Sequence, residues 1–566
     1  MIDNYHFPSI SSNSPSLSNY SFSDTTLRGP DNGLEDDDIT GILCEEQGEA
    51  RAPGISLSTL MATATSTDLC HTDESEDTMT INKLPDNVLI EIFDLCRKDH
   101  NFNRFIHIPR LKDIFNPDSK SSHPLPVWRW HGLVQVCQRW RQIIFGSPRR
   151  LDLQILCSRQ IPVRENLDSL PPFPIAIQYL TFETLTPDEG AGLLAAFEHP
   201  GRIRQIDLCL RGPQLGEVAK AMQRPFPALT HLTLGWHRIR PVLPSGFLGG
   251  SAPCLKYMHL ERVLFPSLPI FLSSTSDLVN LYLNNIPRDG YMSPEAMAAC
   301  LAALPRLKSF FFGSSDTSHA DHIHPPPVTR TLLPALTSFG YRGHHEYLED
   351  LVARIDCPRL SQIYIEYGDE RHRGFDFQAE QLVKFINRSE DPEMSVMSHA
   401  DINFSLCLVT FEMYPSPENR DWGRVTVLIS CEGFQNQVSR MSQVFGQSSA
   451  ILSHVVHLKL SRNEDYVDAY GSAWLVLLRQ FLALRTLHVS RRLAPYLVRA
   501  LKRLPLEMVA EVVPVLDLLY LEDEPASPSR IEEFLTACWL SGRPITIFER
   551  EAEFNERFEV LRHQIR

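Results

Sequence analysis

The sequence predicts an α/β protein in which a short helical domain precedes a long body of repeated β-strands with helices between them. Three observations lead to this fold class. A chain of 566 residues is too long for one ordinary core, so it must form several domains or a repeat array. Two short stretches between Ile81 and Phe145 have helical apolar spacing. From about residue 150, an apolar phrase recurs at nearly constant intervals.

Residues 1–80 form a polar tail that we expect to be disordered. They contain 15 acidic and two basic residues, which is −13 of the formal charge of −15, and few clustered apolar residues. Such a segment cannot bury enough apolar surface to offset the entropy lost on ordering. The remaining residues carry only −2, the difference between −15 and −13. Neither part has a basic face that would neutralise phosphates, which argues against a nucleic-acid partner.

Residues 81–148 are expected to form the helical domain. The first helix follows Leu84 and Pro85, and proline suits a helix start because its missing N–H would have no partner there. Asp86 complements the positive end of the helix dipole. The apolar residues that follow share one helical face: Val88, Leu89, Ile92 and Phe93.

The second helical segment also places its apolar residues on a single face: Leu133, Val136, Cys137, Trp140 and Ile144. Helices this short are marginal in water, so both faces need a partner in the same chain or on another one. An insertion at about residues 97–127 separates the two segments, which is long for a loop inside a compact unit. From periodicity alone, these are two ordinary amphipathic helices of a larger helical domain.

The residues themselves carry a family resemblance. Leu84-Pro85 before a helix ending in Ile92-Phe93, followed by a helix with Val136-Cys137-x-x-Trp140, resembles an F-box. F-boxes are small helical units that bind a Skp-type adaptor and, through it, a cullin-RING ubiquitin ligase. The resemblance covers two short segments, and an F-box usually joins its helices more closely than here. It implies an adaptor-binding surface that comprises Leu84, Pro85, Leu89, Ile92, Phe93, Leu133, Val136, Cys137 and Trp140.

The body, residues 149–548, repeats the phrase apolar-x-x-apolar-x-apolar. The first eight copies start 23 to 29 residues apart, at Ile177, Ile203, Leu229, Leu255, Leu278, Leu307, Leu336 and Leu360, and later copies start at Val455, Leu484 and Leu516. This period and phrase are typical of leucine-rich repeats. Each phrase would form a short strand, and stacked strands with outer helices would give an irregular leucine-rich-repeat solenoid with a parallel sheet. Residues 549–566 are interpreted as a C-terminal tail or capping segment.

Two features make this repeat irregular. The Asn or Cys that standard leucine-rich repeats place after the phrase is replaced, for example by His237 and Val263. No clean phrase occurs between Leu360 and Val455, where strand-like runs at 404–411 and 424–430 are interpreted as degenerate repeats. The alternative for the whole body is a set of unrelated buried strands in an α/β domain.

The combination resembles the fungal F-box proteins in which irregular repeats follow a Ser-Pro-Arg-Arg-Leu-type join, here Ser147 to Leu151. It implies a substrate-recognition subunit of an SCF-type (Skp-cullin-F-box) E3 ubiquitin ligase, whose repeat domain binds an unknown target protein. Such a subunit acts by proximity and contributes no catalytic residue. The alternative is a ubiquitin-independent leucine-rich-repeat scaffold for protein interactions, in which the helical segment caps the solenoid.

Motifs for other functions are missing from the sequence. There is no phosphate-binding loop, dinucleotide fingerprint, hydrolase elbow or H-E-x-x-H, so we expect no cofactor and no enzymatic activity. The potential metal ligands are His319, Asp321, His322, His324, His344 and His345. We expect His319 to His324 to lie in a solvated loop rather than in a metal site, and His344 and His345 to lie at the surface. An enzyme that uses these residues is a third hypothesis.

Cysteine usage and hydropathy point to the compartment. The twelve cysteines include no CxxC pair. No apolar run reaches the roughly 18 residues that span a bilayer, and the N-terminus lacks the pattern of a signal peptide. We therefore expect a soluble intracellular protein of the cytoplasm or nucleus, without a membrane partner.

Overall fold

The computed structural model describes residues 81–98, 129–148, 150–159, 163–180, 184–210, 214–236, 242–314, 329–368, 379–391, 394, 397–416, 425–431, 433–446, 452–462, 473–490, 492–493, 496–497, 512–522, 545–550 and 560–563. Backbone contacts divide the chain into residues 1–73 and residues 74–566, and the described residues belong to the second unit. The predicted tail at 1–80 and nearly all of the insertion at 97–127 lie outside the described residues.

The helical unit consists of the 3₁₀ turn η1 (Ile81–Lys83) and the helices α2 (Asp86–Lys98), α4 (Arg129–Val136) and α5 (Gln138–Gly146). Helix α2 starts directly after Pro85, as expected, and the Pro85 carbonyl accepts hydrogen bonds from the backbone N–H groups of Val88 and Leu89 at 3.0 and 3.1 Å. Asp86 therefore lies in the first turn, where its charge complements the helix dipole.

The prediction of one continuous helical face for the second segment is wrong, because the helix breaks at Cys137. This residue has extended backbone angles, φ −159° and ψ 168°, and its Sγ accepts a hydrogen bond from the Trp140 N–H at 3.5 Å. Cys137 thus acts as the N-cap of α5, a role that a short side chain with an acceptor can fill. The break turns Val136 outward, and its side chain is 59% exposed.

The body contains one 17-stranded sheet. In spatial order its strands are β1 (Ile155–Ser158), β2 (Ile175–Leu180), β3 (Ile203–Leu210), β4 (His231–Trp236), β5 (Tyr257–Glu261), β6 (Asn280–Ile286), β7 (Ser309–Ser314), β9 (Ser338–Gly343), β11 (Gln362–Tyr367), β14 (Val425–Ser430), β13 (Leu408–Tyr414), β12 (His399–Phe404), β15 (His457–Arg462), β16 (Thr486–Ser490), β17 (Leu518–Glu522), β18 (Thr546–Arg550) and β19 (Val560–His563). All but β13 and β19 run in the same direction. The predicted α/β body with a mostly parallel sheet is confirmed.

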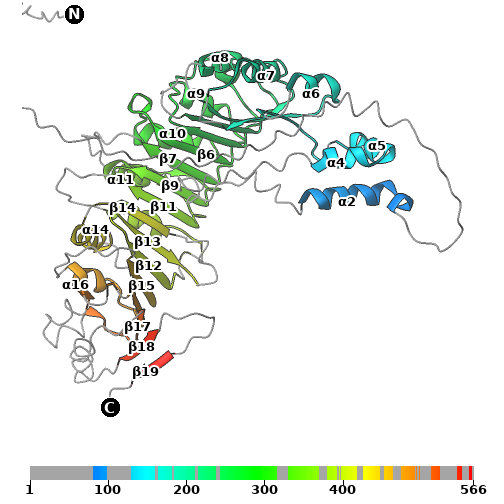
Figure 1. The fold of residues 1–566 in the computed structure, drawn as a ribbon. Helices are drawn as coiled ribbons and strands as arrows, with labels where there is room; N and C mark the ends of the chain where they lie inside the picture. Colours follow the sequence, from blue (N-terminus) through cyan, green and yellow to red (C-terminus); the bar gives the residue numbers. More distant parts are fainter. Residues whose placement is uncertain are drawn as a thin grey trace, which may run out of the picture. The chain divides into compact units, whose positions relative to one another are not determined.

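Helices cover one face of this sheet (Figure 1). They are α6 (Val163–Ser169), α7 (Pro187–Phe197), α8 (Gln214–Ala221), α9 (Leu268–Ser273), α10 (Pro294–Ala302), α11 (His345–Arg354), α12 (Glu380–Asn387), α14 (Phe434–Gly446) and α16 (Ala473–Leu478), with 3₁₀ turns η3 (Phe247–Gly250) and η4 (Arg288–Gly290). A separate pair, β8 (Thr331–Leu332) and β10 (Ile355–Asp356), is also parallel. The core lies between sheet and helices, where Phe312 of β7 stacks on Tyr347 of α11 with ring centroids 5.2 Å apart.

The repeated phrases coincide with strands. From Leu229 onward, the first apolar residue of each phrase is buried and stands two residues before a strand, at Leu229, Leu255, Leu278, Leu307, Leu336, Leu360, Val455, Leu484 and Leu516. The phrase assigned at Ile177 is out of register, because the ladder pairs Ile177, not Leu180, with Ile206 of the next phrase. Leu180 consequently points to the face of the sheet on which none of the described helices lies, called the helix-free face, and is 58% exposed.

The stretch between Leu360 and Val455 departs from the repeat. Strands occur at both predicted positions, but the run at 404–411 spans the tight turn between β12 and β13, where the Ser405 N–H donates to the Leu408 carbonyl at 2.9 Å. A turn this short forces the next strand to run antiparallel. That run is therefore not a degenerate repeat: the chain passes from β11 to β12, returns through β13 to β14, and β14 pairs with β11.

Candidate functional site

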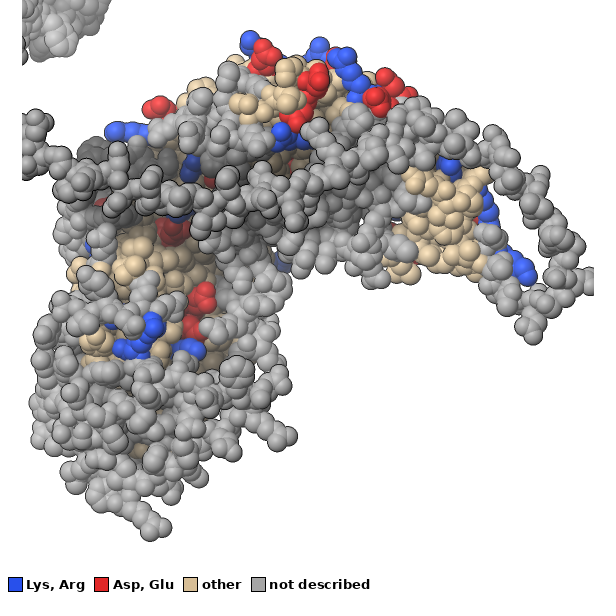
Figure 2. Space-filling view, in the orientation of Figure 1, with Lys and Arg blue, Asp and Glu red and all other residues tan. Residues whose placement is uncertain are grey.

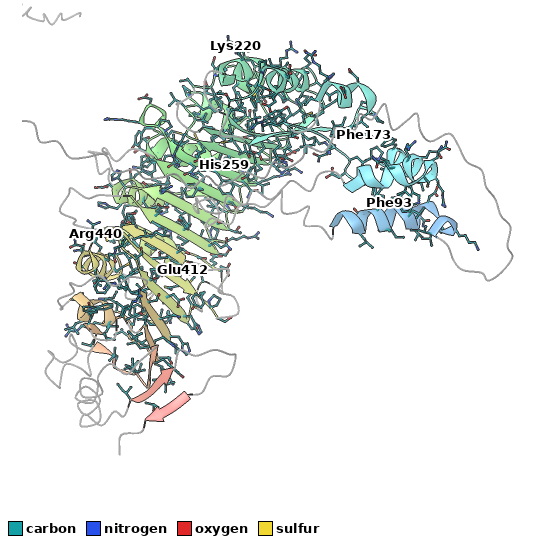
Figure 3. All side chains as sticks on the ribbon, viewed as in Figure 1. Phe93, Phe173, Lys220, His259, Glu412 and Arg440 are labelled. Atoms are coloured by element: carbon teal, nitrogen blue, oxygen red, sulfur yellow. The ribbon has the colours of Figure 1, made fainter. Side chains whose placement is uncertain are left out.

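The helical unit has a small core between α2 and the α4–α5 pair. The Phe93 ring meets the Trp140 indole edge-on, with centroids 4.9 Å apart. Figure 3 shows Phe93 on the side of α2 that faces these helices. The buried apolar residues of the unit are Leu89, Phe93, Val134, Trp140, Ile143 and Ile144. The three helices therefore share one small apolar core.

A second apolar stripe on α2 faces outward. Pro85, Val88, Ile92 and Leu95 follow one another at three, four and three residues, which places them along one side of the helix. Val88 and Leu95 are exposed, Leu95 to 59%, and Ile92 is partly exposed. The described atoms of the helical unit seen in Figure 2 are mostly uncharged, with Lys and Arg at the edge. An exposed apolar stripe of this kind is typical of a surface that binds another protein.

Arg139 ties the start of α5 to the start of α2. Its Nη2 donates to the Leu84 carbonyl and to Asp86 Oδ1, both at 2.6 Å, and its Nε donates to Asp86 Oδ1 at 3.1 Å. The Arg139 and Asp86 side chains are substantially exposed, so this ion pair adds little to stability. Its effect is geometric: it fixes the Leu84-Pro85 corner against α5. Arg150 forms a further ion pair with Glu91 of α2.

The structure divides the predicted adaptor-binding residues into three groups. Leu89, Phe93 and Trp140 are core residues, Leu84, Ile92, Leu133 and Cys137 are partly exposed, and Pro85 and Val136 are exposed. Sequence reasoning missed Leu95, which lies beyond the motif. Its spacing of seven residues from Val88 was the signal that could have placed it on the same side of α2.

The helix-free face of the sheet carries a second apolar cluster. Strand residues alternate between the two faces, so the neighbours of the core residues point away from the helices. Tyr282, Phe311 and Tyr364 form a buried cluster there, against which Tyr257 and Leu428 pack. Beside it, Arg342 forms an ion pair with Glu366 at 2.7 Å, and the Tyr364 hydroxyl donates to Glu366 at 3.2 Å. Aromatic residues and arginine on one face are typical of protein interfaces.

On the same face, Asp207 of β3 has an unusual environment. Burial raises the pKa of its carboxyl group to about 6, and a hydrogen bond to the Gln178 side chain opposes this shift. Because the folded state then binds the proton more tightly than the unfolded chain does, stability falls as the pH rises from the ordinary value of 3.8 to about 6 and stays lower above it.

We expect Asp207→Asn to raise the thermal midpoint at pH 8, where the carboxylate is ionised, and to lose most of this effect as the pH is lowered through 6 toward 4. Differential scanning calorimetry at pH 4 and pH 8 measures both values. Glu217→Gln removes an exposed carboxylate of α8 and serves as the control. Equal effects of Asp207→Asn at the two pH values would contradict this assignment.

The histidines considered as metal ligands do not form a site in the described part of the chain. His319 to His324 lie outside it. His344 precedes α11, and His345 Nδ1 lies 3.3 Å from Glu346 Oε2. The His345 side chain is only 14% exposed, so the expectation that it lies at the surface is wrong. Among the described residues, no three His, Cys, Asp or Glu side chains are grouped to hold a metal ion.

No protein-family model matches the chain, and no curated protein matches it. Within the described ranges, no helix is both long and apolar enough to cross a membrane.

Proposed function

We propose that the chain is a substrate-recognition subunit of an SCF-type E3 ubiquitin ligase. In this proposal the helical unit is an F-box that binds a Skp-type adaptor, and the sheet body, an irregular leucine-rich-repeat solenoid, binds a target protein. The adaptor links the chain to a cullin-RING ligase, and ubiquitin transfer follows from the proximity of the target to the ligase-bound ubiquitin.

The observation that carries the proposal is the outward stripe of α2. Pro85, Val88 and Leu95 stay exposed although Leu89 and Phe93, on the adjacent side of the same helix, are buried. An amphipathic helix that only closed a core would have polar residues on the outward side. A partner that covers the stripe would bury its apolar surface, which stabilises a complex by about 25 cal/mol per Å² before the costs of association.

The test is co-purification of the full chain with a purified Skp-type adaptor. We expect a one-to-one complex that Val88→Glu and Val136→Lys together disrupt. Both side chains are exposed, and the new charges suit the helix ends on which they lie, negative at the start of α2 and positive at the end of α4. The variant should therefore stay folded.

Leu180→Glu is the matched control, because it places a charge on an exposed apolar residue of β2, 58% exposed against 59% for Val136. It should leave the complex intact. Absence of a complex with the folded wild-type chain would overturn the F-box assignment. The chain would then fit the alternative, a ubiquitin-independent scaffold whose helical unit caps the repeats.

A further inference from the structure

Four side chains with acid–base or donor groups lie in two adjacent rows of the helix-free face, over β3, β4 and β5. The ladder places Cys209, Gly235 and Glu261 in one row across these strands, and Asp207, Thr233 and His259 in the next. Alternation along each strand directs both rows to the same face. Figure 3 marks His259 within this part of the sheet.

Gly235 leaves the centre of its row without a side chain. A Cβ atom at this position would lie 3.6 Å from Cys209 Sγ and 3.9 Å from Glu261 Oε2, which are ordinary van der Waals distances. The thiol and the carboxylate therefore border the space above Gly235, and a larger residue at 235 would fill it. On the β6 side, the His259 ring meets Tyr282 edge-on at 6.1 Å, and Tyr257 lies 5.5 Å from Tyr282.

The carboxylates of Asp207 and Glu261 both influence the pKa of the Cys209 thiol, which borders this space. Burial raises the pKa of the Cys209 thiol to about 11, with further increases from Glu261 and Asp207, while Arg262 acts in the opposite direction. Asp207 also helps to raise the pKa of Tyr257, so this ring lies close to the carboxylate. Burial lowers the pKa of His259, against the effect of Glu261, and leaves the imidazole neutral at pH 7. With the thiol and imidazole neutral, the charged groups that act on Cys209 are two carboxylates and one guanidinium, a net charge of −1.

One polar atom of the group lacks a partner. His259 Nε2 is buried and has no hydrogen-bond partner within the described ranges. Buried polar side-chain atoms in folded proteins are bonded in the great majority of cases, so an unpaired one at a charged cluster points to a missing ligand. A metal ion does not fit, since no three potential ligands of the described residues are grouped closely enough.

We propose that the space above Gly235 binds one Lys or Arg side chain of the target protein. A basic side chain would neutralise the excess carboxylate charge of Asp207 and Glu261, and its N–H groups would reach His259 Nε2 as a neutral acceptor. The rings of Tyr257 and Tyr282 add a cation–π contribution on the β6 side. This inference deepens the proposed function, because it rests on target binding by the sheet body.

The experiment selects ligands from a phage-displayed library of random peptides on the immobilised full-length protein. We expect Lys or Arg to be enriched among the bound peptides. Selected peptides are then synthesised twice, once as found and once with citrulline for Arg or norleucine for Lys. Loss of the charge should weaken binding to the wild-type chain about tenfold or more, the usual worth of a hydrogen bond to a charged group.

Variants of the site distinguish binding at this position from non-specific attraction of basic peptides to the negatively charged chain. On Glu261→Gln and Asp207→Asn the charged and uncharged peptides should bind with nearly equal affinity, and on Gly235→Leu neither should bind. Glu217→Gln, which removes an exposed carboxylate from α8 on the helix-covered side, should behave as wild type. The proposal would be overturned if no peptide were recovered or if the recovered peptides were not enriched in Lys or Arg. It would also be overturned if Glu261→Gln preferred the charged peptides as strongly as the wild-type chain does.

Adaptor co-purification, run on the same proteins, keeps the two proposals distinguishable. Glu261→Gln alters the sheet body and should retain the adaptor. A wild-type chain that binds basic peptides but no adaptor would refute the ligase role while leaving this site intact.

Discussion

Replacing Leu234 with Ala is expected to lower the free energy of unfolding of the sheet body by about 2–5 kcal/mol. Leu234 lies in the centre of β4, 1% exposed, and pairs in register with Leu208 of β3 and Leu260 of β5. Truncation removes buried methyl groups and leaves a cavity in a row that the neighbouring strands cannot close without shifting. The midpoint of urea unfolding, followed by far-ultraviolet circular dichroism, measures the effect.

Leu180→Ala is the matched control, since the same side chain is removed from another strand. Leu180 is 58% exposed on the helix-free face, and exposed substitutions usually change stability by no more than about 0.5 kcal/mol. The pair also tests the register. If the sequence phrase at Ile177 were correct, Leu180 would be a core residue and its truncation would cost as much as that of Leu234.

This register shows how far the sequence could predict the body. The spacing of the phrases predicts the strands that follow Leu229 to Leu360, and the structure buries the first residue of each phrase and starts a strand two positions later. The signal is reliable because a parallel strand covered by helices needs the same apolar positions in every copy. At the N-terminal end it fails: the phrase assigned at Ile177 has the right spacing to Leu180 and Phe182, but Ile177 pairs with Ile206 of β3, three residues out of register.

The antiparallel β13 could not be predicted from the phrase. Val409, Phe411 and Met413 alternate with polar residues as in any strand with one buried face. Strand direction depends on the length of the connection to β12, and sequence periodicity does not report it. The same limit applies to the group of Asp207, Cys209, His259 and Glu261, whose members lie on separate strands. They come together only once the ladder is known.

In the helical unit, the sequence identified the helices and their apolar faces but not which apolar residues stay exposed. A residue type and its spacing indicate that a side chain needs apolar surroundings, without saying whether its own chain supplies them. Phe93 and Val88 both fitted the face of the first helix. The structure buries Phe93 against Trp140 and leaves Val88 on the outward stripe, so the two residues require different experiments.

Trp140→Ala is expected to unfold the helical unit while the sheet body keeps its own stability. Replacing a buried Trp with Ala typically costs about 3–5 kcal/mol, and the core of α2, α4 and α5 is too small to lose that amount. Hydrogen exchange measured by mass spectrometry should show loss of protection across residues 86–98 and 138–146. Protection in β4 to β7 should not change.

Trp140→Phe is the control that separates packing from the indole itself. Trp140 Nε1 is buried without a hydrogen-bond partner among the described residues, so replacing the indole breaks no hydrogen bond of this atom. A phenyl ring can still pack against Phe93. We expect this variant to retain protection in α2 and to bind the adaptor.

Retained protection in Trp140→Ala would contradict the assignment of Trp140 to the core of the unit. Loss of the adaptor in Trp140→Ala without loss of protection would instead place this side chain in the contact itself. Val88→Glu with Val136→Lys should give that second pattern, because those substitutions alter the outward surface and leave the Phe93–Trp140 pair in place.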